Sequence, residues 1–237
     1  MFWHIVDYNA PLSLSSLKAV ASLNGEAVTQ AKTRDLIRVE TNGQAYYIKR
    51  YWTAGKKLRK YLFRSRAKAE WENLQYFKHL KIPAPLLVSY GEYRTLFHYE
   101  YGAFVMRALG NVIPLDTVLA EATLPCSLRL TLLQQIAQNL RRLHDYHFIH
   151  GDCFVRNFLV SPQEAKVYFT DCPRGRHMWG PFFDYGRVRD LASFYKGVQG
   201  SLSLTDQLRF FLWYCGEPRL TVKNKKLLRK VIKRLGL

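Results

Sequence analysis

The chain has 237 residues and a formal net charge of +18 at pH 7, because 36 Lys and Arg residues stand against 18 Asp and Glu. With 48% hydrophobic and 23% charged residues, its composition is that of a globular protein and excludes a disordered one. No apolar run approaches the roughly 20 residues of a transmembrane helix, and the first residues lack the regions of a secretory signal. The positive charge predicts contact with polyanions: nucleic acid, anionic lipid headgroups or phosphorylated substrates.

The four cysteines form no CxxC pair and have no metal-ligand spacing. We interpret them as reduced thiols that fill small apolar spaces, which predicts a reducing compartment. They are Cys126, Cys153, Cys172 and Cys215.

The first half of the chain is predicted to be mostly sheet with one helix. Residues 34–40 alternate polar and apolar side chains, and residues 44–50 follow a turn signal as their partner strand. Apolar side chains recur at helical spacing over 67–80, and Pro83 ends that helix. Two further strands are predicted at 86–90 and 104–108.

The second half is predicted to be mostly helical. Ser127 is the predicted N-cap of a long helix, after which apolar residues recur every three or four positions. Two short apolar runs at 158–160 and 167–169 are predicted to form a small hairpin. Further helices are predicted at 190–197, 206–215 and 222–235. A strand-rich part followed by a helical part with a hairpin insert is typical of the protein-kinase fold.

The segment from His150 to Asn157 has the pattern HxDxxxxN of kinase catalytic loops. Phosphoryl transfer needs a carboxylate beside the acceptor hydroxyl and an amide oxygen that reaches a metal on the phosphates. Asp152 is therefore the candidate catalytic base, and Asn157 is a candidate metal ligand. The alternative is that Asp152 only caps a turn. We interpret His150 as a structural loop histidine and not as a base.

Asp171 directly follows the second strand of the small hairpin, where kinases carry the aspartate that binds magnesium. Because the hairpin between Asn157 and Asp171 folds back on itself, both side chains can meet at one ion. The alternative is a turn aspartate before Pro173. This pair of motifs in the right order is the main argument for a kinase.

Two positions in the first half complete the set. Lys49 lies in the strand where a kinase lysine holds the α- and β-phosphates, and Glu70 on the next helix is its expected partner in preference to Glu72. Both could instead be solvated surface charges. Gly25 is the only glycine placed to serve a phosphate loop, although no GxGxxG is present, and Met106 is assigned to the ATP-binding set.

Only nineteen positions separate Asp171 from Asp190, and no Ala-Pro-Glu follows. This stretch is too short for a protein-kinase activation segment with its peptide-docking platform, so a compact acceptor is favoured over a protein. Three side chains in it are candidates for gripping an anionic acceptor, the alternative being a solvated loop. They are Arg174, Arg176 and His177.

The predicted C-terminal helix, residues 222–235, has an apolar face surrounded by cations. Such a helix can lie on an anionic membrane surface, where each cation contributes about 1 kcal/mol. It can equally pack its apolar stripe on the helical part of the protein. The basic run 56–64 is another candidate for phosphate or lipid contact.

With these motifs in hand, the chain resembles the lipopolysaccharide core kinases, the family of heptose (WaaP-type) and Kdo kinases. The resemblance extends from about Gly25 to Phe211. It is carried by residues 25–28, 69–74, 81–85, 143–159, 171–176 and 189–192. It implies an α+β, bilobal protein-kinase-like fold. A small antiparallel-sheet N-lobe with one helix (1–106) would hold the nucleotide, and a mainly helical C-lobe (107–237) would hold the catalytic loop, metal and acceptor.

The resemblance also implies ATP and Mg²⁺ as cofactors, and a heptose or Kdo hydroxyl of the inner core on lipid A as acceptor. It suggests these roles: Asp152 as base, Asn157 and Asp171 at magnesium, Lys49 with Glu70 at the phosphates, and Asp190 as a structural brace under the catalytic loop. The enzyme is expected to be cytoplasmic, on the inner face of the inner membrane. Two departures from protein kinases are Gly151 in place of the arginine of HRD, and Cys172-Pro173 in place of Phe-Gly.

Three alternatives stay open from the sequence. The first is a kinase of another small molecule or of a protein tyrosine. The second is a catalytically silent, membrane-associated kinase-like module, against which the full set of candidate residues argues. The third is nucleic-acid binding driven by the charge; no zinc-finger or RNP pattern supports it, so no nucleic-acid partner is expected.

Overall fold

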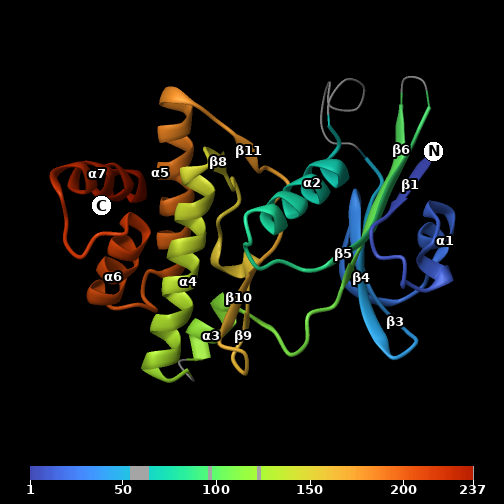
Figure 1. Cartoon of the computed structure of the whole chain (residues 1–237), viewed down its shortest axis with the longest axis horizontal. Helices are drawn as coiled ribbons and strands as arrows, with labels where there is room; N and C mark the ends of the chain where they lie inside the picture. The colour runs from blue at the N-terminus through green and yellow to red at the C-terminus, as the bar shows by residue number, and fades with distance from the viewer. Residues whose placement is uncertain (54–63, 96–97, 122–123, 237) are drawn as a thin grey trace. The chain divides into compact units, whose positions relative to one another are not determined.

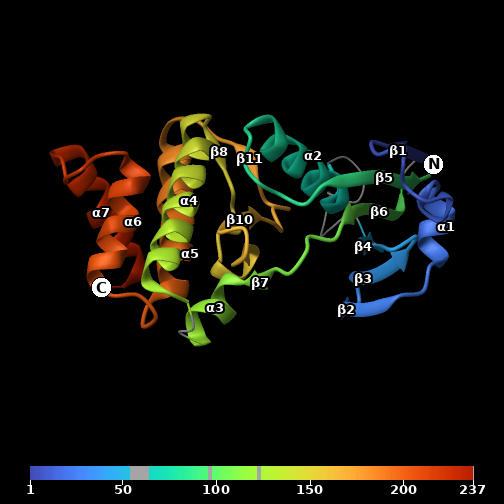
Figure 2. The ribbon, with the colours of Figure 1, turned by 60° about the horizontal axis from the view of Figure 1, so that its bottom comes forward.

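The computed structural model describes residues 1–53, 64–95, 98–121 and 124–236. These fall into two compact units, Met1–Tyr76 with Ala84–Leu109 and Phe77–Pro83 with Gly110–Leu237. Figures 1 and 2 show the ribbon from two directions. Residues 56–63 of the predicted basic run lie outside the described residues.

The first unit contains a six-stranded antiparallel sheet with the strand order β1-β5-β6-β4-β3-β2 (Figure 2). The predicted hairpin is confirmed as β3–β4. Asn42 and Gly43 at its turn both have positive φ, as the favoured two-residue hairpin turn requires. The strands are β1 (Phe2–Ile5), β2 (Glu26–Ala31), β3 (Arg34–Thr41), β4 (Gln44–Tyr51), β5 (Leu87–Arg94) and β6 (Tyr99–Arg107).

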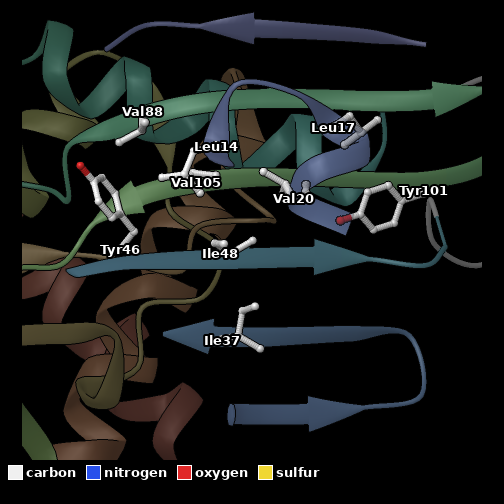
Figure 3. Packing of buried hydrophobic residues seen from close by; sticks show 10 residues of the cluster. Leu14, Leu17, Val20, Ile37, Tyr46, Ile48, Val88, Tyr101 and Val105 are labelled. Atoms are coloured by element: carbon white, nitrogen blue, oxygen red, sulfur yellow. The ribbon is translucent and has the colours of Figure 1, made fainter. Parts of the chain in front are cut away.

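One face of this sheet is covered by the short helices η1 (Leu12–Leu14) and α1 (Leu17–Ser22). Figure 3 shows Leu14, Leu17 and Val20 over the buried strand residues. The other face receives α2 (Arg66–His79), whose Trp71 ring stacks on that of Tyr90 at 5.3 Å between centroids. Because side chains alternate along a strand, the central strands contribute residues to the cores on both faces of the sheet.

The second unit is mainly helical and carries two small sheets, ordered β10-β9-β7 and β11-β8. The small predicted hairpin is confirmed as β9–β10, with Phe158 opposite Phe169. The elements are β7 (Ile113–Pro114), α3 (Leu115–Glu121), α4 (Cys126–Asp145), β8 (Phe148–Ile149), η3 (Val155–Asn157), β9 (Phe158–Ser161), β10 (Lys166–Phe169), β11 (Arg176–His177), α5 (Gly180–Val198), α6 (Leu204–Cys215) and α7 (Val222–Leu235).

Two predicted helix starts in this unit are wrong. The long helix α4 begins at Cys126 with Pro125 as its N-cap, so Ser127 lies inside its first turn. Helix α5 begins ten residues before the predicted Asp190, at Gly180, with a proline in its first turn, where proline is well tolerated. In the first turns of α5, Phe182 and Tyr185 are exposed. The apolar residues there do not mark one buried face, so the sequence pattern did not predict this part of the helix.

Aromatic rings form the core beneath the catalytic segment of the second unit. Phe158 and Phe169 of the β9–β10 hairpin meet edge to face, and Phe77 contacts Phe169 and the His150 ring. Farther along the chain, Phe194 of α5 stacks on Phe210 of α6 at 4.2 Å. The segment after α4 is thus fixed by packing from below.

The α+β fold with an N-terminal antiparallel sheet and a helical C-terminal part is therefore confirmed. Helices α1 and α3, strands β1 and β2 and the short strands β7, β8 and β11 are additional to the predicted elements. Strand β2 is exposed along its whole length, so no apolar alternation marks it in the sequence. Over the described ranges, no helix combines the length and apolarity needed to cross a membrane.

Replacing Leu17 by Ala should lower the free energy of unfolding by about 2–5 kcal/mol, because its side chain is buried between α1 and the sheet. Leu12→Ala is the matched control: the same atoms are removed from a side chain that is 88% exposed, and the change should stay within about 0.5 kcal/mol. Urea denaturation of both variants measures the difference. Equal losses would contradict the packing of α1.

Candidate active site

In the first unit, Lys49 of β4 and Glu70 of α2 form a buried ion pair. The Lys49 Nζ lies 2.5 Å from the Glu70 Oε1, and the two residues are 8% and 1% exposed. Tyr51 Oη donates a hydrogen bond to the other carboxylate oxygen, Oε2, at 2.5 Å. Glu72, the less favoured partner, instead pairs with Arg64 and Lys68.

The period of two along β4 explains this arrangement. Ile48 packs in the cluster beneath α1, whereas Lys49 and Tyr51 share the opposite face, which α2 covers. Tyr51 is the member of the site that the sequence analysis missed, and its position two residues after Lys49 is the signal that could have found it. Removing one member of such a buried pair costs about 3–5 kcal/mol, so the three groups hold each other in place.

In the second unit, Asp190 of α5 accepts hydrogen bonds from the backbone of the candidate catalytic loop. Its Oδ2 accepts a hydrogen bond from the backbone N–H of His150 at 2.7 Å, and its Oδ1 accepts one from Gly151 at 2.9 Å. The Nε2 of His144 also lies 3.4 Å from Oδ2. Asp190 is 1% exposed. Two consecutive backbone amides are thereby fixed just before Asp152.

Asp152 and Asn157 are linked through the backbone of the loop. The Asn157 Nδ2 donates to the carbonyl oxygen of Asp152 at 2.7 Å, and the Phe154 N–H donates to the same oxygen at 2.8 Å. Because its nitrogen is engaged, the amide of Asn157 presents Oδ1 as its acceptor atom. The Asp152 side chain is 19% exposed, with its Oδ1 3.4 Å from the Nη1 of Arg174.

The β9–β10 hairpin brings Asp171 next to Asn157 along the backbone. Thr170 donates two hydrogen bonds to the carbonyl oxygen of Asn157, from its N–H at 3.0 Å and from its Oγ1 at 2.9 Å. Asp171 itself has a φ of +55°. A residue other than glycine in this left-handed region is strained and is often found at functional sites. The backbones of the two motifs therefore lie side by side, and the binding of one ion by both side chains stays a prediction.

His150 lies buried between these groups and the aromatic core. Its ring stacks on Phe77 at 5.7 Å, and its Nδ1 accepts the N–H of Asp152 at 3.4 Å. Burial lowers the pKa of the His150 imidazole, although the nearby carboxylates of Asp190, Asp152 and Asp171 act in the opposite direction. Burial therefore disfavours the charged imidazole, and the interpretation of His150 as structural stays a prediction.

Gly151 fills the position of the missing HRD arginine, and the space around it explains why. Its φ is +80°, and an added Cβ would lie 2.9 Å from the Cβ of Arg174 and 3.1 Å from the Nη2 of Arg189. The Sγ of Cys172 donates to the carbonyl oxygen of His150 at 3.3 Å. The segment after Asp171 thus packs directly against the catalytic loop.

The three candidate acceptor residues lie in this same segment. The Arg174 side chain is 65% exposed and reaches Asp152. Arg176 and His177 form the exposed strand β11, which pairs with Ile149 and Phe148 of β8. Exposed basic side chains therefore lie along the segment that follows Asp171, and the first of them contacts the candidate catalytic carboxylate.

The other two predicted ATP-binding residues lie in the first unit. Gly25 precedes β2, and an added Cβ there would lie 2.5 Å from the carbonyl oxygen of Arg38, so close strand contact alone accounts for the glycine. The turn between β2 and β3 consists of Lys32 and Thr33, with no glycine. Met106 is paired with Tyr47 near the end of β6. The roles of Gly25 and Met106 stay predictions.

The donor set suits a magnesium ion that is shared with a nucleotide. Within the described residues, no group of three or more His, Cys, Asp or Glu side chains could hold a metal alone. Mg²⁺ commonly takes one or two protein oxygens and completes its shell with phosphates and water. Asn157 and Asp171, as an amide oxygen and a carboxylate, fit that need.

The sequence profile of the "Lipopolysaccharide kinase (Kdo/WaaP) family" matches residues 13–214 of the chain. The chain belongs to this family. Two relatives are named "Lipopolysaccharide core heptose(I) kinase WaaP". The one from Pseudomonas aeruginosa (strain PAO1) is 23% identical over 85% of this chain and 81% of its own length. The one from Escherichia coli (strain K12) is 25% identical over 84% and 81%.

A solved structure described as "WaaP in complex with acyl carrier protein" has the same fold. Its TM-score is 0.74 at 22% identity, over 92% of this chain and 90% of that one. The predicted family and the kinase-like fold are therefore confirmed. The chain is therefore a member of a family of lipopolysaccharide kinases.

Asp190→Asn should disorder the catalytic loop, because an amide nitrogen would face one of the two backbone N–H groups that the carboxyl group now accepts. We expect a loss of about 1–3 kcal/mol in the free energy of unfolding. Amide hydrogen exchange at His150 and Gly151 should also become faster. Asp184→Asn, on the exposed side of the same helix, is the control and should change neither. Unchanged exchange in Asp190→Asn would refute the brace.

Proposed function

We propose that this protein transfers the γ-phosphoryl group of ATP to a sugar hydroxyl, of heptose or Kdo, in the inner core of lipopolysaccharide. The observation that carries the proposal is the hydrogen-bonded catalytic loop. Asp152, Asn157 and the strained Asp171 are tied to one another through backbone contacts and rest on Asp190. Membership of the kinase family and the heptose kinase relatives support the acceptor class.

Asp152 is the proposed catalytic residue. Its carboxylate is fixed through the loop backbone and is partly open to solvent, so it can accept the proton of an incoming hydroxyl. Positioned acid–base help of this kind contributes about 10²–10⁴-fold to a rate. Arg174, 3.4 Å away, would draw an anionic acceptor toward the same carboxylate.

The remaining groups would hold the nucleotide. Asn157 through Oδ1 and Asp171 through its carboxylate would bind Mg²⁺, which neutralises charge on the phosphates when it is present. Lys49 would hold the α- and β-phosphates, with its ammonium aligned by Glu70 and indirectly by Tyr51. Asp190 acts only through the loop that it braces.

A compact acceptor is favoured by the short chain after Asp171. Since α5 already begins at Gly180, only residues 172–179 remain outside the helix. Part of that stretch pairs with β8 as β11. This leaves less chain for a peptide-docking platform than the sequence alone suggested, which disfavours a protein tyrosine as acceptor.

Such a substrate also sets the place of action. A core sugar on lipid A is anchored in a bilayer, so we propose a cytoplasmic enzyme that works at the inner face of the inner membrane. One solved relative is a complex with acyl carrier protein. A carrier protein is therefore a second partner to include in binding measurements.

The direct test is to incubate the protein with ATP, Mg²⁺ and dephosphorylated core lipopolysaccharide, and to locate the added phosphate by mass spectrometry. Asp152→Asn should lower turnover by at least about 100-fold and leave ATP binding intact, because it removes the base and not the nucleotide contacts. Asp145→Asn, an exposed aspartate at the end of α4, is the control and should retain activity.

Other outcomes would favour the alternatives. If phosphate is found on a soluble metabolite or a protein tyrosine and none on the core sugars, the protein is a kinase with that other acceptor and not a core-sugar kinase. A protein that binds ATP with Mg²⁺ to no measurable extent would be a silent module. Wild-type turnover in Asp152→Asn would remove Asp152 from the chemistry.

A further inference from the structure

The C-terminal helix α7 uses its apolar stripe inside the protein. Leu227 is 8% exposed and Val231 is 1% exposed, and both belong to the face of α7 that packs on the rest of the second unit, where α5 is its main neighbour. Of the two uses that the sequence left open, packing and membrane contact, these two side chains take the first and are not available for insertion into a bilayer. Ile232 of the same helix is 39% exposed.

The exposed surface of α7 is rich in cations. Seven of its fourteen residues are Lys or Arg, and none is Asp or Glu. Lys223, Lys226, Lys230 and Arg234 follow one another at intervals of three or four residues and are exposed, so they form one row along successive turns. With no carboxylate on the helix to offset them, these cations create a strong local positive potential.

Exposed aromatic side chains lie on the neighbouring helix. Trp179, the N-cap of α5, is 65% exposed, Phe182 is 73% exposed, and Tyr185 is 55% exposed. The Arg234 guanidinium of α7 lies over the Tyr185 ring at 4.8 Å from its centroid, and its Nη2 donates to the Tyr185 Oη at 3.3 Å. This contact joins the aromatic residues of α5 to the basic face of α7.

We propose that these residues form one docking surface for a bilayer with anionic lipid headgroups. The aromatic–basic surface consists of Trp179, Phe182 and Tyr185 on α5 with the cationic face of α7. Each Lys or Arg near an anionic membrane contributes about 1 kcal/mol, and large aromatic side chains favour the interface between headgroups and acyl chains. The choice of a membrane over other polyanions rests on the proposed function, whose acceptor is lipid-anchored.

The surface begins close to the candidate active site. Arg174 contacts Asp152, and five residues later Trp179 stacks its ring on that of His177, a candidate acceptor residue. Five residue steps span at most about 17 Å. A bilayer that touches Trp179 would therefore bring a lipid-anchored sugar within a few sugar lengths of Asp152.

Binding in this mode is electrostatic and interfacial. Because the apolar stripe of α7 stays packed, the cations would contact headgroups from outside, while Phe182 and Trp179 reach deeper. Raising the salt from about 0.1 M to 1 M shortens the Debye length from about 10 Å to about 3 Å. The protein should then leave the vesicles, unlike one held by an inserted helix.

The test is co-sedimentation of the full chain with vesicles of phosphatidylethanolamine and phosphatidylglycerol, without ATP or lipopolysaccharide. The variant Lys223→Ala/Lys226→Ala/Lys230→Ala should partition about 100-fold more weakly, from about 1 kcal/mol for each cation. Phe182→Ser should weaken binding by roughly tenfold. The control Lys18→Ala/Lys78→Ala/Lys166→Ala removes the same charge from exposed residues elsewhere and should bind as the wild type does.

Several results would overturn the inference: no vesicle binding by the wild type, equal binding to neutral phosphatidylcholine vesicles, or equal loss in the row variant and its control. Binding of the row to RNA or to acyl carrier protein, without binding to vesicles, would also overturn it.

A separate assay keeps this inference apart from the proposed function. With a core oligosaccharide freed of its lipid, the row variant should turn over at the wild-type rate, because none of its three residues is in the candidate active site. If no oligosaccharide is phosphorylated while vesicle binding persists, the proposed function fails and the docking surface stands.

Discussion

The carboxyl group of Asp190 would be costly to bury alone, and its two backbone donors come from the catalytic loop itself. These two hydrogen bonds fix the backbone of His150 and Gly151, which directly precedes Asp152. The same loop orients the amide of Asn157, and the carbonyl oxygen of that residue receives Thr170, the neighbour of Asp171. Asp190 therefore anchors the backbone just before Asp152, and a chain of further hydrogen bonds connects that backbone to Asn157 and to the neighbour of Asp171.

In the first unit, a lysine ammonium group is buried between the sheet and helix α2. Alternation along β4 places Lys49 and Tyr51 beneath α2, and both oxygens of the Glu70 carboxylate are used, one by each. Trp71, beside Glu70 on α2, packs against the sheet and so fixes that helix over the strand. The packing of Trp71 therefore positions Glu70, and the ion pair with Glu70 fixes the position of the Lys49 ammonium group.

Strong local patterns made much of this predictable. Alternation with Asn42-Gly43 predicted the β3–β4 hairpin, and the two short apolar runs at 158–160 and 167–169 predicted the β9–β10 hairpin. The failures have physical causes. The start of α5 exposes aromatic residues, β2 is exposed throughout, and a proline precedes the chosen N-cap of α4. The contact of Tyr51 with Glu70 and the strained backbone of Asp171 depend on tertiary structure, which no local pattern records.

The proposed function requires that Asn157 and Asp171 bind the metal ion of the nucleotide and that Lys49 binds its phosphates. A crystal structure with Mg²⁺ and a non-hydrolysable ATP analogue tests it most directly. We predict the Asn157 Oδ1 and an Asp171 carboxylate oxygen at about 2.1 Å from the ion, with the Lys49 Nζ in hydrogen-bond contact with an α- or β-phosphate oxygen. A metal held by other residues, or a nucleotide bound away from Lys49, would contradict the account.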